Sequence, residues 1–355
     1  MSLRPSLRRH PLRRADAGWT QPLLLLLRLL ILGAGLGVLT GTTLKFLAPK
    51  LGVAPPPNAP PPEPIASPGP ENNGLGRFVI KKENKALSAK LAQLASTQKD
   101  LKVGAFALVL DDGSYAQLNP DVALPAASSI KTPILLVALE ALDAGKLKLD
   151  EPLSLNKTVV GGGSGWMGGQ PLGSQFSVLE VATEMIRVSD NTATNLLIQR
   201  LGGKTALNAR FLELGLDGTV INNWLPDLEG TNTTTPRDQA RSIALVETAE
   251  VLSPRSRDLF RLTLGTSRTD TLIPTGWLRG IGGGVGEVNS ALLTRGVRAY
   301  NKTGDIGIAY VDSALIELAD GRRAVASYMV QGPFNSPRST NLIRAMAAAT
   351  AAAFK

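Results

Sequence analysis

The sequence has 355 residues, a formal net charge of +9 and no cysteine, and its single histidine, His10, lies in an arginine-rich N-terminal tail. These counts exclude a thiol nucleophile, a disulfide and a thiolate metal site, and they leave no histidine for a Ser-His-Asp triad in the body of the chain. Residues 1–21 alone carry a net charge of +4, and no dense basic run follows, so the clustered footprint of a nucleic-acid-binding protein is missing.

Three segments precede the part of the chain that can fold. Residues 1–21 form a basic tail, residues 22–44 are apolar apart from Arg28, and residues 45–74 are rich in proline. About 20 apolar residues are enough to cross a bilayer, and the preceding arginines place the N-terminus in the cytoplasm. We expect an inner-membrane anchor followed by an extended linker, with a monomeric catalytic domain outside the cytoplasm. A cleaved signal peptide is the alternative, but no small-residue cleavage site follows the apolar run.

Residues 75–355 are expected to form the folded domain. Apolar spacing, caps and turn residues predict an order of helix, two strands, a helical block, three strands and a final helix. This order predicts an α/β (α+β) fold with a five-stranded, largely antiparallel sheet, terminal helices and an inserted all-helical subdomain. The predicted helices are 81–96, 128–142, 178–188, 192–201, 204–214, two more that begin at Pro236 and Pro254, and 337–354; the predicted strands are 103–110, 114–118, 297–302, 306–318 and 324–330.

Ser128 and Lys131 form an S-x-x-K motif at the start of a predicted helix. Residues three apart share one helix face, and the first turn of a helix favours a developing negative charge. A lysine among apolar residues can lose its proton and act as a base. The same spacing recurs at residues 96–99 and 154–157, so the motif alone does not identify a nucleophile.

Two further motifs, together with the first, form a recognisable set. Ser189-Asp190-Asn191 separates two predicted helices, and Lys302-Thr303-Gly304 ends a predicted strand. Each alone is an ordinary turn. In this order, S-x-x-K, S-D-N and K-T-G are the signature set of the serine β-lactamases and penicillin-binding proteins. From residue 75 to residue 355 the chain resembles the class A serine β-lactamase family, which implies a β-lactamase/transpeptidase-like fold.

The resemblance implies a role for each motif residue. Ser128 would attack a β-lactam carbonyl, Lys131 would help to activate it, and Ser189, helped by Lys302, would pass a proton to the leaving nitrogen. Substrate binding would fall to Asn191, to the Lys302-Thr303 pair at the substrate carboxylate, and to Gly304, which lets the backbone come close to the ligand. The backbone N–H groups of Ser128 and Asp305 would form the oxyanion hole.

One loop departs from the family pattern. Asn223-Trp224-Leu225-Pro226-Asp227-Leu228-Glu229 keeps the family's frame, but Leu225 stands where the family has the glutamate that activates the deacylating water. Glu229 stands where the family has a water-holding asparagine, so we expect Glu229 to be the deacylation base. Asn223 and Asn232 replace an arginine–aspartate pair, and they permit a neutral hydrogen-bonded pair instead.

We expect a serine hydrolase of the class A β-lactamase type, which opens β-lactam rings through a Ser128 acyl-enzyme. Two alternatives stay open. One is a D,D-peptidase acting on peptidoglycan stem peptides, and the other is a domain that binds penicillin or cell-wall peptide without turnover; Leu225 favours these two. The expected partner is a small-molecule β-lactam or a peptidoglycan peptide, and no metal, organic cofactor or nucleic acid is implied.

Overall fold

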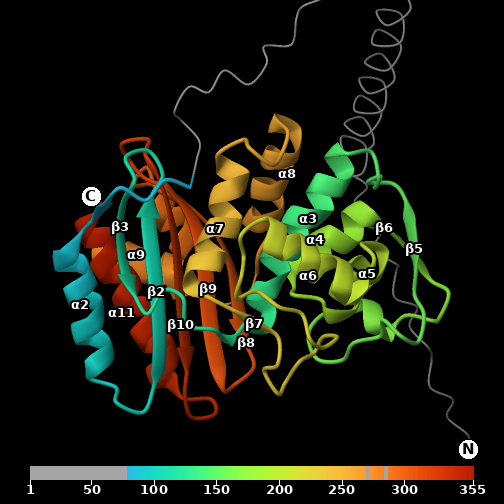
Figure 1. Cartoon of the computed structure of the whole chain (residues 1–355), viewed down its shortest axis with the longest axis horizontal. Coiled ribbons are helices and arrows are strands. Elements are labelled where there is room, and N and C mark those ends of the chain that lie inside the picture. The colour runs from blue at the N-terminus through green and yellow to red at the C-terminus, as the bar shows by residue number, and fades with distance from the viewer. Residues whose placement is uncertain (1–77, 269–271, 284–286) are drawn as a thin grey trace, which may run out of the picture. The chain divides into compact units, whose positions relative to one another are not determined.

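A six-stranded sheet is the centre of the protein, whose computed structural model describes residues 78–268, 272–283 and 287–355 (Figure 1). All of these residues belong to one compact unit, residues 72–355. The strand order is β1-β3-β2-β10-β9-β8, and every neighbouring pair is antiparallel except β1 with β3. The strands are β1 (Lys82–Glu83), β2 (Lys102–Val109), β3 (Ser114–Leu118), β8 (Arg298–Asp305), β9 (Ala309–Glu317) and β10 (Arg323–Gln331).

The predicted fold class is confirmed, with one strand more than expected. The predicted helix 81–96 was wrong at its start, because Lys82–Glu83 pairs with β3 and the helix α2 runs only over Lys85–Ser96. Asn84 sets this start, since its side chain accepts a hydrogen bond from the backbone N–H of Leu87, as an N-cap residue does.

The two faces of the sheet pack against different helices. Successive side chains of a strand point to opposite faces, so in β2 Phe106 and Leu108 join one core while Ala105 and Ala107 join the other. The second core lies under α2, α9 (Leu272–Gly280) and α11 (Pro337–Ala353), and the first lies under the helical block (Figure 1). Burial on both faces explains why the central strands β2 and β10 are largely apolar.

The helical block matches the prediction closely, except at the serine. Ser177, Thr235 and Ser253 each accept a backbone N–H three residues on, which confirms the predicted N-caps. The predicted helix 128–142 is instead a 3-10 turn, η2 (Ala127–Ile130), followed by α3 (Lys131–Asp143). The other helices are α4 (Val178–Arg187), α5 (Asn191–Arg200), α6 (Gly203–Glu213), α7 (Pro236–Glu247) and α8 (Pro254–Gly265).

Several short elements have no strong sequence signal. They are β4 (Leu124–Pro125) paired with β7 (Thr233–Thr234), β5 (Pro152–Ser154) paired with β6 (Gln175–Ser177), the 3-10 turn η3 (Met167–Gly169), and the helices α9 and α10 (Val288–Leu293). Strands of two or three residues show no alternation, so only tertiary pairing identifies them.

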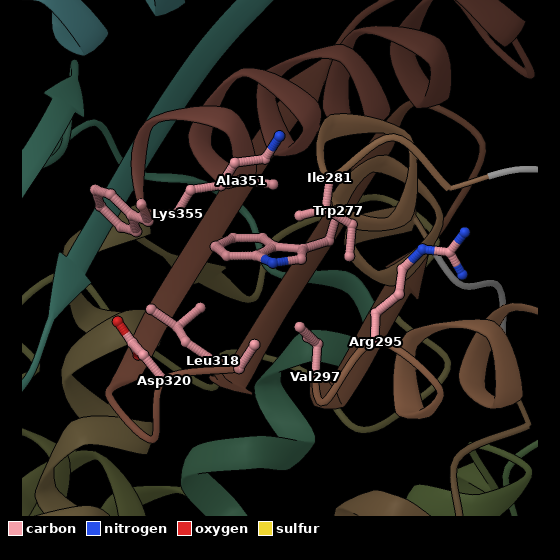
Figure 2. A pocket seen from close by; sticks show the side chains of 10 residues that line it. Trp277, Ile281, Arg295, Val297, Leu318, Asp320, Ala351 and Lys355 are labelled. Carbon is pink, nitrogen blue, oxygen red and sulfur yellow. The ribbon is translucent and has the colours of Figure 1, made fainter.

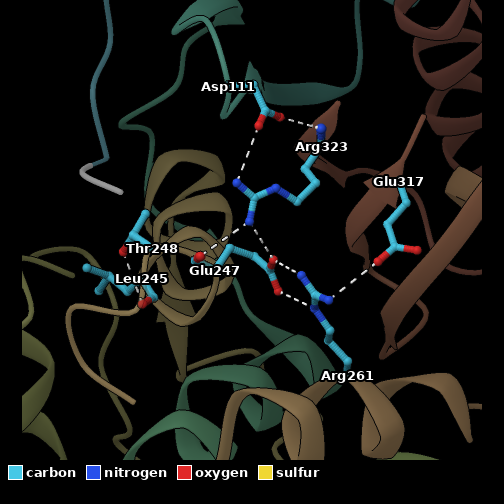
Figure 3. A network of polar contacts seen from close by, with 7 residues as sticks. All are labelled: Asp111, Leu245, Glu247, Thr248, Arg261, Glu317 and Arg323. Atoms are coloured by element: carbon cyan, nitrogen blue, oxygen red, sulfur yellow. Dashed lines mark hydrogen bonds and ion pairs between the residues drawn. The ribbon is translucent and has the colours of Figure 1, made fainter. Parts of the chain in front are cut away.

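A buried carboxylate joins the helical block to the sheet (Figure 3). Glu247, at the end of α7, is 3% exposed and accepts hydrogen bonds from Arg261 of α8 and Arg323 of β10. Arg261 also pairs with Glu317 at 3.6 Å, and Arg323 with Asp111 at 3.4 Å. These contacts fix the two layers against each other, which matters because the site draws residues from both.

The predicted membrane anchor, residues 22–44, lies outside the described residues. In residues 78–268, 272–283 and 287–355, no helix has the length and apolar character needed to span a membrane.

Candidate active site

The side chain of Lys131 lies at the centre of the site. It begins α3 and is fully buried. Its Nζ lies 3.0 Å from Oγ of Ser128, 2.9 Å from Oγ of Ser189 and 2.9 Å from Oδ1 of Asn191, and it also donates to the carbonyl oxygen of Ser189 at 2.6 Å. The structure therefore brings the first two predicted motifs into direct contact around one amine.

Burial lowers the pKa of Lys131 well below its usual value, and the nearby charge of Lys302 lowers it further, while Asp190 acts in the opposite direction. A neutral amine carries a lone pair. At 3.0 Å from the Ser128 hydroxyl, that lone pair can accept the hydroxyl proton as the oxygen attacks an electrophile.

The turn between α4 and α5 presents Ser189 to the lysine. Ser189 adopts a left-handed conformation, with φ of 60°, and Asp190 caps α5 by accepting the backbone N–H of Ala193 at 2.8 Å. The other carboxylate oxygen of Asp190 accepts the N–H groups of Trp166 and Met167 at 2.7 and 2.9 Å. Asp190 thus holds the turn that carries Ser189, and the strained conformation persists because these bonds fix it.

Strand β8 carries Lys302 and Thr303, the first two residues of the third motif, into the site. Lys302 is fully buried, its Nζ donates to the carbonyl oxygen of Thr303 at 2.7 Å, and burial lowers its pKa to about 7. Gly304 lies against the serine-bearing turn, because a Cβ at this position would come within 2.9 Å of the backbone nitrogen of Ser128. Gly304 therefore allows the close approach of β8 to η2, whereas the approach to a ligand stays a prediction.

Ser128 and Asp305 open onto one cavity of about 90 Å³. Its lining comes from the serine turn, the loop between β5 and η3, the start of α5, the loop after α6, and the end of β8 with the residue after it. The lining residues are Ala127, Ser128, Gly163, Ser164, Asn191, Leu225, Pro226, Asp227, Leu228, Asp305 and Ile306.

The chain is similar to known proteins in both sequence and fold. A profile described as Beta-lactamase2, the beta-lactamase enzyme family, matches residues 86–354. The chain belongs to the beta-lactamase enzyme family. Among solved structures, PBP-A is 40% identical over 78% of this chain and 98% of its own, with a TM-score of 0.71. A class A β-lactamase, named as the last common ancestor of Gram-negative bacteria, is 26% identical over 76% and 100% of the two chains, with a TM-score of 0.64.

A curated relative, a beta-lactamase of Streptomyces fradiae, is 28% identical over 193 residues. The match covers 50% of this chain and 63% of the relative. The chain thus aligns with less than two thirds of that enzyme's length, whereas it covers the solved structure of PBP-A almost completely.

Within this beta-lactamase-family site, Leu225 is 5% exposed and lines the cavity together with Ser128. Asn195 holds its backbone on both sides, accepting the Leu225 N–H at 2.9 Å and donating to the Leu225 carbonyl at 2.7 Å. An apolar side chain therefore faces the serine at a firmly held position.

Glu229 is exposed, and among the described residues the cavity lining includes Leu225 and Asp227 but not Glu229. The predicted neutral asparagine pair does form, although through the backbone of one partner. Asn232 Oδ1 accepts the Asn223 N–H at 2.8 Å, and Asn232 Nδ2 donates to the Asn223 carbonyl at 3.1 Å.

Two buried carboxylates near the site were missed by sequence reasoning. Asp227 accepts hydrogen bonds from Thr231 and from the backbone of Asn232, at 2.8 and 2.6 Å, and so shapes the loop. Asp312 lies opposite Thr303 on β9, and burial raises its pKa to about 6. Its one sequence signal is an acidic residue within an otherwise apolar strand, which indicates a positioned carboxylate.

Proposed function

We propose that the protein is a serine acyl-transfer hydrolase of the D,D-peptidase type. In this proposal penicillins acylate Ser128, and the acyl group is released from the serine only slowly. The observation that carries the proposal is the Lys131 amine, buried and within 3.0 Å of both the Ser128 and Ser189 hydroxyl oxygens, beside a cavity lined by Leu225.

The proposed acylation uses these three side chains in order. Lys131 accepts the Ser128 proton as the serine oxygen bonds to the substrate carbonyl carbon. The C–N bond then breaks, and the leaving nitrogen takes a proton from Ser189, whose hydroxyl regains one from Lys131. The backbone N–H groups of Ser128 and Asp305, at the same cavity, would stabilise the oxyanion, and each such donor typically contributes about 3–4 kcal/mol.

Substrate recognition is assigned to β8 and α5. The Lys302 ammonium and the Thr303 hydroxyl would receive the carboxylate shared by penicillins and D-alanyl peptide ends. Asn191 already uses Oδ1 for Lys131 and donates Nδ2 to the Gly162 carbonyl at 2.8 Å. A substrate amide would therefore replace, or share, the contact between Asn191 and Gly162.

Slow deacylation follows from Leu225. Freeing an ester acyl-enzyme requires a base that deprotonates water, and a leucine cannot accept a proton. Similarity to PBP-A supports acylation rather than its slow reversal, because a leucine-to-glutamate mutant of that protein, 39% identical to this chain, was solved as an acyl-enzyme complex with penicillin G. A peptide substrate can instead be released by an amine acceptor, which needs no water-activating carboxylate.

The second candidate function is a β-lactamase in which Glu229 is the deacylation base. Its support is that Glu229 follows Leu225 by four residues in the loop that lines the cavity. Glu229→Gln decides the point. A hundredfold or larger fall in penicillin turnover, with acylation unchanged, supports the base role; unchanged turnover makes Glu229 a loop residue.

Two separate assays test the proposed function: a time course of intact mass with penicillin G, and cleavage of a D-alanyl-D-alanine peptide by unacylated protein in the presence of an amine acceptor. Rapid acylation, loss of the adduct over hours and cleavage of the peptide are expected. Loss of the penicillin adduct within seconds would favour the β-lactamase, and acylation without peptide cleavage would favour a binding domain.

We also propose that residues 22–44 anchor the protein in the inner membrane, with residues 75–355 outside the cytoplasm. The arginines before the apolar run support this orientation. Protease added to intact spheroplasts should release the domain, and protection of the domain until lysis would refute the orientation.

A further inference from the structure

The positive charge of the folded domain is concentrated around α2. Residues 78–102 carry six lysines and two acidic residues, a net charge of +4, whereas residues 103–355 carry 23 basic and 24 acidic residues. All six lysines are exposed, and they lie on α2 or within a few residues of its two ends. We call them the α2 lysines: Lys81, Lys82, Lys85, Lys90, Lys99 and Lys102.

The charges of the α2 lysines are not compensated nearby. Within residues 78–268, 272–283 and 287–355, none of the six forms an ion pair. Of the two acidic residues in this stretch, Asp100 is paired with Arg338 of α11 at 2.5 Å, and Glu83 is half-buried and accepts the Ser88 hydroxyl at 2.8 Å. The acidic residues of the turn between β2 and β3 are also paired: Asp111 with Arg323 at 3.4 Å and Asp112 with Arg322 at 3.7 Å. The lysine charges are therefore free to meet an anionic partner.

The outer side of α2 is suited to lie against a flat surface. Leu87 and Leu91 are buried on its inner side, and Lys85 and Lys90 flank its outer side. The other exposed positions of the helix are small or uncharged: Ala86, Ala89, Ala92, Gln93 and Ser96. Figure 1 shows α2 beside α11 at the outer edge of the domain. No residue of α2 lines the cavity at Ser128, so a partner bound here leaves that cavity open.

The proline-rich linker leads directly to this helix. The described residues begin at Phe78, three residues before Lys81. At about 3.1 Å per residue, residues 45–77 span at most roughly 100 Å, so the proposed anchor keeps the α2 lysines near a bilayer. Tethering of this kind gives a second contact an effective concentration up to roughly millimolar. Each lysine near an anionic surface strengthens binding by roughly fivefold, so several weak contacts suffice.

We propose that the α2 lysines dock the domain on anionic phospholipid headgroups of the membrane that holds the anchor. A lysine ammonium is a point charge on a flexible stem, and it needs no fixed partner geometry, which suits a fluid layer of phosphate groups. Docking would hold Ser128 close to the bilayer instead of at the full reach of the linker. The inference rests on the proposed anchor and is independent of the chemistry at Ser128.

Lysine labelling of the full-length protein tests the proposal. The protein is placed in nanodiscs of phosphatidylcholine alone or mixed with phosphatidylglycerol, treated briefly with an acetylating reagent and mapped by mass spectrometry. We expect the α2 lysines to be labelled at least roughly fivefold more slowly in the anionic nanodiscs, and high salt should remove this protection. Lys146, Lys148 and Lys157 are exposed lysines before α4, and their labelling should not change.

A charge-reversed variant identifies the helix as the contact. Lys85→Glu combined with Lys90→Glu should abolish the protection of Lys99 and Lys102, with an unchanged melting temperature because both positions are exposed. The matched control is Lys146→Glu with Lys148→Glu, which makes the same charge change elsewhere and should keep the protection.

Three results would overturn the proposal. They are equal labelling in the two kinds of nanodisc, equal loss of protection in the two double variants, and protection by soluble polygalacturonate but not by anionic lipid, which would assign the lysines to an anionic polymer. Co-elution of the protein with phosphatidylcholine nanodiscs reports the anchor by itself. Failure of the anchor and failure of the docking are therefore read from different measurements.

Discussion

Replacing Leu225 with glutamate should turn a long-lived penicillin adduct into a short-lived one. The leucine side chain is 5% exposed, shares the Ser128 cavity and has its backbone held on both sides by Asn195. A glutamate at this position has a similar length, and its carboxylate would face the ester. Burial would raise its pKa toward the range in which a carboxylate is an effective base.

A positioned general base contributes about 10²–10⁴-fold, which corresponds to roughly 2.7–5.4 kcal/mol of the deacylation barrier. The cavity of about 90 Å³ has room for a hydrolytic water beside the ester. We therefore expect the deacylation rate constant of Leu225→Glu to rise at least a hundredfold. The melting temperature should fall, because a carboxylate replaces a buried methyl pair.

The assay acylates the protein with penicillin G, removes the excess and follows the intact mass. Leu225→Gln is the matched control, since it has the size and polarity of glutamate but cannot act as a base. Equal deacylation rates for the glutamate and glutamine variants would refute the assignment of Leu225 as the missing catalytic position.

Three other predictions test the rest of the site and the fold. Ser189→Ala should slow penicillin acylation by roughly 10²-fold or more, because the leaving nitrogen loses its proton donor. Lys302 is cationic below its pKa of about 7, so acylation by an anionic penicillin should fall as pH rises through about 7 in the parent; in Lys302→Arg the guanidinium keeps its charge and this fall should vanish. Glu247→Ala should cost about 3 kcal/mol of unfolding free energy, the lower end for breaking a buried pair, since both arginines stay about a quarter exposed.

Kinetics and melting curves check these outcomes. Acylation within threefold of the parent would remove Ser189 from the proton path. An unchanged alkaline limb in Lys302→Arg would assign that limb to another group. For the fold, Glu317→Ala is the control, because Glu317 is 26% exposed and meets Arg261 only at 3.6 Å. Equal destabilisation by Glu247→Ala and Glu317→Ala would contradict the central role of Glu247.

Local chemistry made much of the fold predictable. The caps at Ser177, Thr235 and Ser253 depend on residues three positions away, and Ser128 and Lys131 meet because they are three apart. Choosing among three S-x-x-K motifs required their order along the chain. Ser96 ends α2 and Ser154 lies in β5, whereas Ser128 lies at the buried lysine.

The rest depends on tertiary contacts that no local pattern encodes. Asp190 and Asp227 orient loops through backbone N–H groups far along the chain or across a turn. A cavity of about 340 Å³ at Trp277 exists because α11 returns beside α9 (Figure 2). The exposure of Glu229 follows from the shape of its loop, so alignment to a family pattern could not fix which way its side chain faces.

The most direct test is peptide mapping of the full-length protein after incubation with penicillin G. We expect the mass of the whole penicillin to be added to the peptide that contains Ser128, Lys131→Ala to slow this addition greatly, and the adduct in the parent to persist for hours. A label on Ser96, Ser129 or Ser154, or no label in folded protein, would contradict the assignment of Ser128 as the nucleophile.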